Sequence, residues 1–98
     1  MASQIRAVGI SWFREEDYVR AHSIMDDPQV LPVTYREWQK KAEGTERQIK
    51  AQGFIVYRAI IDPDTFPAWC ALRGLNVDAK ARMAFGSEFA FEQVKNTH

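Results

Sequence analysis

One long amphipathic helix, predicted at residues 35–52, constrains the fold of this chain more than any other segment. Its apolar positions recur every three or four residues and so form one stripe along the helix. They are Tyr35, Trp38, Ala42, Thr45 and Ile49. Acidic residues precede basic residues by four positions elsewhere on the helix, a pattern typical of a solvated face. We therefore expect this helix to pack through the stripe against one partner surface.

Both ends of this helix are signalled by neighbouring residues. Thr34 is a typical N-cap, and Glu37, three residues later, completes the pattern of a capping box. Val33 and Trp38 occupy the two positions of a hydrophobic staple. Gly53 can adopt the left-handed conformation that commonly ends a helix. The sequence therefore predicts where this helix begins and ends.

Alternation of side chains predicts two strands around the long helix. Strands are predicted at residues 5–12 and 54–61, and the other helices at 14–25, 65–73 and 79–94. The first strand has small residues on one face, at Ala7, Gly9 and Ser11. Because small side chains permit a close approach, we expect a large element, most simply a helix, to pack on that face.

The order strand, helix, helix, strand, helix, helix predicts an α+β fold. Residues 1–98 form a single domain, with about four helices packed on a two-stranded sheet. A pair of helices between the strands would return the chain to its starting end, so we expect antiparallel pairing. Residues 6–8 (Arg-Ala-Val) are similar to residues 58–60 (Arg-Ala-Ile), which is consistent with duplication of a strand–helix–helix unit or with chance.

Charge and composition narrow the class of protein. Thirteen basic and thirteen acidic residues leave no net charge, whereas proteins dedicated to nucleic acids usually carry a basic excess. No apolar run approaches the length of a membrane span, and residues 1–10 lack the features of a signal peptide. A single cysteine, Cys70, cannot form an internal disulfide. We expect a cytoplasmic protein with no membrane partner, and the balanced charge disfavours a nucleic-acid partner without excluding one.

The sequence predicts no catalytic residue, no cofactor and no metal site. The five glycines are scattered and form no phosphate-binding loop. Two histidines and one cysteine match no metal-ligand spacing. Cys70 and His22 could in principle form a nucleophile–base pair, but the apolar helical surroundings of Cys70 favour a structural role. An enzyme therefore ranks last among the functions we consider.

The helix at residues 79–94 carries the strongest indication of a partner. Its apolar residues extend beyond one stripe, and a two-stranded core cannot easily cover them all. The candidate interface residues are Met83, Phe85, Phe89 and Phe91. The leading hypothesis is therefore a non-catalytic interaction or regulatory module that forms a homodimer, with a further protein partner or a small ligand as other possibilities.

Two other functions remain open at this stage. Arg58 lies among aliphatic residues of a strand, so it must pair with a carboxylate, face solvent at an edge, or bind an anion. A small-molecule or anion-binding regulator would use Arg58 with Trp12, Trp38 and His22, although core packing also explains the tryptophans. A DNA-binding protein would use the helix-turn-helix outline of residues 65–82. Its candidate phosphate contacts are Lys80 and Arg82.

Overall fold

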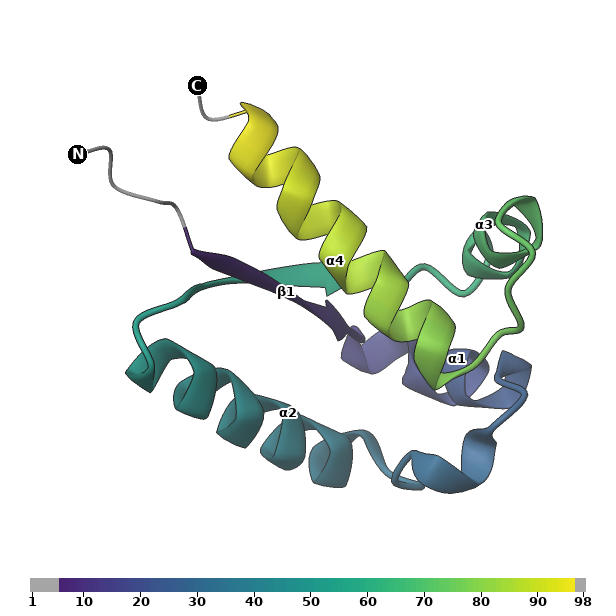
Figure 1. Cartoon of the computed structure of the whole chain (residues 1–98). Helices are drawn as coiled ribbons and strands as arrows, with labels where there is room; N and C mark the ends of the chain where they lie inside the picture. Colours follow the sequence, from purple (N-terminus) through teal and green to yellow (C-terminus); the bar gives the residue numbers. More distant parts are fainter. Residues whose placement is uncertain (1–5, 97–98) are drawn as a thin grey trace.

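Two short parallel strands lie at the centre of the structure, a computed structural model that describes residues 6–96 (Figure 1). The elements in chain order are β1 (Ala7–Trp12), α1 (Tyr18–Ile24), α2 (Tyr35–Ala51), β2 (Ile55–Ile60), α3 (Phe66–Leu72) and α4 (Ala79–Asn96). Single 3-10 turns at Glu15–Asp17 and Pro28–Val30 precede α1 and α2. The predicted α+β class, with four helices and a two-stranded sheet, is confirmed. Ile5, the predicted start of the first strand, and His98 lie outside the described residues.

The predicted antiparallel pairing is wrong. Ala7 pairs with Ile55 and Trp12 pairs with Ile60, so both strands run in the same direction. α1 has only seven residues and lies beyond the end of β1 (Figure 1). α2 alone therefore carries the chain back to the starting end of β1. The 17 residues of α2 rise by about 25 Å, enough to span a strand of six residues, which is roughly 20 Å long. β2 therefore starts beside the start of β1, as in a strand–helix–strand crossover.

α4 and α2 cover opposite faces of this sheet (Figure 1). On the α4 face, a Cβ atom added to Gly9 would lie 1.8 Å from the carbonyl oxygen of Gly86. A Cβ atom added to Gly86 would lie 2.6 Å from the carbonyl oxygen of Gly9. The backbones of β1 and α4 are thus in direct contact, which confirms that the small residues of β1 admit a helix.

The core lies at the carboxyl end of the sheet, where the chain leaves each strand. Trp12 and Phe13 at the end of β1 each place a ring centroid 5.0 Å from that of Trp38 on α2, in edge-to-face contacts. Tyr18 is almost fully buried beside them, and its hydroxyl donates to the carbonyl of Pro32. These rings hold α1 and α2 against the sheet, so Trp12 and Trp38 are core residues.

The start of α2 follows the prediction in part. The hydroxyl of Thr34 accepts a hydrogen bond from the Glu37 amide at 3.2 Å, which confirms the N-cap. The same hydroxyl donates to the Glu37 carboxylate at 2.9 Å, so Glu37 contacts the side chain of Thr34 instead of its amide. The predicted staple does not form, because Val33 is 82% exposed. At the other end Gly53 has a φ of 93°, as expected of a helix-ending glycine.

Candidate functional site

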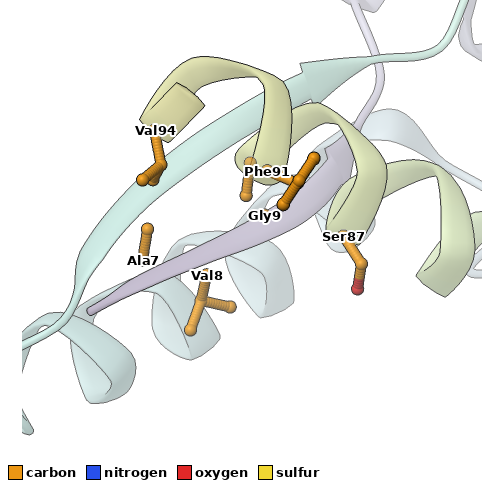
Figure 2. Close-up of a pocket in the computed structure, with 7 residues that line it drawn as sticks. Ala7, Val8, Gly9, Ser87, Phe91 and Val94 are labelled. Atoms are coloured by element: carbon orange, nitrogen blue, oxygen red, sulfur yellow. The ribbon is translucent and has the colours of Figure 1, made fainter. Parts of the chain in front are cut away.

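A groove of about 370 Å³ lies between the first half of β1 and the second half of α4 (Figure 2). Its lining residues are Ala7, Val8, Gly9, Ser87, Ala90, Phe91 and Val94. None of these side chains is charged, and Figure 2 shows Val94 of α4 opposite Ala7 of the strand. The volume is in the range of pockets that accept a small ligand or a large side chain.

The groove exists because α4 crosses the sheet diagonally (Figure 1). The two backbones meet at Gly9 and Gly86, and α4 then diverges from β1 towards its own carboxyl end. Ala7 and Ala90 are too small to fill the widening space between them. An apolar hollow therefore remains open to solvent beside the contact.

The four predicted interface residues of α4 fall into two sets. Met83 and Phe91 are 73% and 66% exposed, and they lie eight residues apart on the flank of α4 beside the groove. Phe85 and Phe89 lie on the side of α4 that faces α3 and are only partly exposed. The ring centroid of Phe85 is 5.1 Å from that of Trp69. Sequence periodicity could not separate the two sets, because the position of α3 decides which phenylalanines are covered.

Arg58 forms an ion pair with Glu46 of α2. Its Nε and one terminal nitrogen donate to the two carboxylate oxygens, both at 2.8 Å. Its guanidinium also lies 3.8 Å from the ring centroid of Trp12. These hydrogen bonds hold the pKa of the Glu46 carboxyl below its ordinary value and raise the pKa of Arg58. Of the three expectations for Arg58, the structure shows pairing with a carboxylate, at a side chain that is still partly exposed.

Glu46 is a residue that the sequence analysis missed. The predicted stripe placed Thr45 inward and Glu46 on the solvated face, whereas Thr45 is exposed and Glu46 is only 7% exposed. The spacing alone permits either residue at that position of the stripe. The available signal was Arg58, which needs a carboxylate partner when a helix covers its strand.

The candidate ligand site built around Arg58 is only partly assembled. Trp12 touches Arg58, and Trp38 is in contact with Trp12. His22 has no direct contact with these residues: its ring centroid is 6.0 Å from that of Tyr18, which lies between it and Trp38, and its Nε2 is 3.4 Å from the Leu31 carbonyl oxygen. The structure therefore separates His22 from the arginine with which it was grouped.

The two candidate nucleic-acid contacts also have different surroundings. Lys80 is exposed, but Arg82 is only 7% exposed and donates two hydrogen bonds to Asp27, at 2.9 and 3.0 Å. Asp27 also accepts from the Ala79 amide at 3.0 Å, and the pairing with Arg82 lowers the pKa of its carboxyl. The sequence near Asp27 gives no signal of this pair, because the partner follows 55 positions later. The guanidinium of Arg82 is thus already neutralised inside the fold.

Comparison with other proteins gives no guide to function. The chain matches no family model, no curated protein and no solved structure. Function must therefore be argued from the geometry alone.

Cys70, the candidate nucleophile, lies in the core. Cys70 is fully buried on α3, and burial raises the pKa of its thiol, which disfavours a reactive thiolate. Across the described residues, no group of three or more His, Cys, Asp and Glu side chains is placed to hold a metal ion. Within residues 6–96, no helix has both the length and the apolar character needed to cross a bilayer.

Proposed function

We propose that this protein is a non-catalytic interaction module that forms a homodimer through α4. The proposal rests on one observation: an uncharged groove lies directly beside an exposed aromatic residue, Phe91, on its own rim. A two-fold axis makes such a surface self-complementary, because each copy then places its Phe91 in the groove of the other. The ring would fill the space that Ala7 and Ala90 leave open.

Two further properties of this surface support self-association. Met83 extends the exposed apolar flank of α4, and methionine and aromatic residues are enriched at the cores of protein interfaces. The chain carries no net charge, so two copies approach without a long-range repulsion. The groove itself contains no charged side chain that would have to be buried unpaired.

The alternative functions receive less support from the geometry. An anion would have to compete with Glu46 for the guanidinium of Arg58, and with Asp27 for that of Arg82. The exposed Lys80 alone does not make a phosphate-binding surface, since affinity for nucleic acids depends on several neutralised phosphates. We therefore retain the homodimer as the proposed function.

Sedimentation at micromolar concentration tests the proposal on the 11.3 kDa chain. We expect the wild type to sediment at twice the monomer mass. Phe91→Asp should weaken association by at least about 30-fold, because a charge would enter the dry centre of the interface. The control is Val33→Asp, which places the same charge at an exposed valine next to α2 and should leave the dimer intact. A monomeric wild type would overturn the proposal.

A further inference from the structure

A second, smaller pocket lies between α3 and α4, on a different side of α4 from the groove. Its volume is about 130 Å³. Its lining residues are Trp69, Phe85, Glu88, Phe89 and Glu92. Three aromatic rings and two carboxylates therefore surround a space smaller than a drug-sized ligand requires. This composition differs from that of the groove, which has no charged side chain.

Packing between α3 and α4 fixes the aromatic walls of this pocket. The rings of Trp69 and Phe85 meet edge to face, with centroids 5.1 Å apart and an angle of 79° between their planes. Phe66 stacks on Trp69 at 5.8 Å and supports it from within the core. Phe89 has no ring–ring contact with any other residue in the described part of the chain. Its π surface is therefore not used by another ring.

The charges around the pocket are unbalanced. Arg73 donates two hydrogen bonds to the carboxylate of Glu88, at 3.1 and 2.8 Å, and thereby neutralises it. Glu92 is exposed and forms no ion pair with any residue between positions 6 and 96. Of the two carboxylates that line the pocket, that of Glu92 therefore carries no ion pair within the described residues.

We propose that this pocket binds an alkylammonium cation. Aromatic faces attract cations, and a carboxylate beside them adds a Coulombic attraction that a neutral ligand cannot use. One wall of the pocket already holds a cation in this way: the guanidinium of Arg73 lies 4.0 Å from the ring centroid of Trp69 and pairs with Glu88. Phe89 and Glu92 offer an incoming cation the same two groups.

The pocket has room for a cationic head group and little more. Two sources share this chemistry: a free quaternary amine such as choline, and a lysine or methyl-lysine side chain on a partner protein. The proposal is independent of the α4 homodimer, since none of the five lining residues lines the groove. Either proposal can fail without the other.

NMR titration of the full chain tests the proposal with choline chloride as the first probe. The indole N–H signal of Trp69, identified by its loss in Trp69→Phe, should shift on addition of choline but not on addition of the same concentration of sodium chloride. The neutral analogue of choline, with carbon in place of the ammonium nitrogen, should bind more weakly. If the neutral analogue binds as tightly as choline, or if choline causes no shift at tens of millimolar, the proposal is wrong.

Two substitutions separate the contributions of the ring and the carboxylate. Phe89→Leu retains an apolar side chain but removes the ring, and Glu92→Gln removes the charge at an exposed position where folding is not at risk. Each should weaken choline binding by about two- to fivefold, the range of a single exposed cation–π contact for Phe89 and of a favourable exposed ion pair for Glu92. The control Glu16→Gln removes an exposed charge in the 3-10 turn before α1, which is not part of the pocket, and should change nothing. Unchanged binding in Glu92→Gln would contradict the proposal.

A third probe identifies the source of the cation. The probe is acetylated and amidated trimethyl-lysine, which presents the same head group on a peptide backbone. Tighter binding of this compound than of choline assigns the pocket to a side chain of a partner protein. Tighter binding of choline assigns it to a free amine. Failure of both compounds to shift the Trp69 signal rejects the pocket as a cation site.

Discussion

Two of the arginine–carboxylate pairs, Arg82–Asp27 and Arg58–Glu46, differ in how far solvent reaches them. In the pair that links Asp27 to α4, the side chains of Arg82 and Asp27 are 9% and 18% exposed. In the pair that links α2 to β2, the side chain of Arg58 is 45% exposed and that of Glu46 is 10% exposed. A buried charge that loses its partner cannot be rehydrated, whereas an exposed one can. The same kind of pair should therefore respond differently to mutation.

We expect Asp27→Asn to destabilise the fold by about 3–5 kcal/mol, the usual effect of leaving one member of a buried ion pair alone. Glu46→Gln should cost only about 1–2 kcal/mol, since the free guanidinium of Arg58 can turn to water and the amide still accepts one hydrogen bond. Urea denaturation of both variants measures the difference. Equal losses would show that exposure does not set the energies of these pairs.

The same carboxylates predict how stability depends on pH. Hydrogen bonding to arginine holds the pKa of Glu46 and that of Asp27 below their ordinary values of 4.5 and 3.8. As the pH falls below about 5, the unfolded chain therefore binds protons first, and the stability contributed by the pairs is lost on the way to their folded pKa values. Above about pH 6 this contribution is complete and constant. Melting temperatures between pH 7 and pH 3 should fall less steeply for Glu46→Gln than for the wild type.

At the scale of the elements, local signals in the sequence were sufficient to locate most helices and strands. The cap at Thr34, the glycine at position 53 and the small residues of β1 each act within a few positions of themselves. The prediction was wrong at Thr45 and Glu46, where a contact with a distant residue decides which side chain is buried. Both residues lie at the margin of the apolar stripe, and the choice depends on Arg58, which meets α2 only in the folded chain.

Two glycines in helices provide a test of the contact between α4 and β1. By helix propensity alone, changing either glycine to alanine should stabilise the fold by about 1 kcal/mol. At Gly44 a new Cβ would meet only the end of the Arg47 side chain, at 3.9 Å, so Gly44→Ala should stabilise the fold by that amount. At Gly86 it would meet the backbone of Gly9 at 2.6 Å, so Gly86→Ala should be destabilising by about 1–3 kcal/mol. Thermal unfolding of the two variants should show shifts of opposite sign.

At the scale of the whole molecule, sequence patterns could not predict the direction of strand pairing. Alternation of side chains is the same in parallel and antiparallel strands, and the outcome depended on α1 lying beyond the end of β1 instead of beside it. The groove and the pocket could not be predicted from the sequence either, because each lies between α4 and another element, β1 or α3. The excess of apolar residues on α4 did indicate a surface of interest. Which of its phenylalanines remain exposed depends on the packing of all four helices.

The free edge of β2 is a second surface through which two copies of this molecule can associate. On the side of β2 that faces β1, the amides of Ile55 and Ile61 donate to the carbonyl oxygens of Arg6 and Trp12, at 2.8 and 2.9 Å. Hydrogen bonds alternate along a parallel pair, so the amides of Val56 and Arg58 point away from β1. An open edge of this kind can pair with a strand of another chain. It is therefore a competitor of α4 as a dimer contact.

Hydrogen exchange along β2, measured over a range of protein concentrations, distinguishes the two modes of association. If the dimer forms through α4, the amides of Tyr57 and Ala59 should exchange slowly because they donate to β1. Those of Val56 and Arg58 should exchange quickly at every concentration, since α4 association leaves this edge in water. Ser87 and its neighbours on α4 should become better protected as the dimer forms. Concentration-dependent protection of Val56 and Arg58 would mean that the two sheets join edge to edge, and the proposed role of Phe91 would then be wrong.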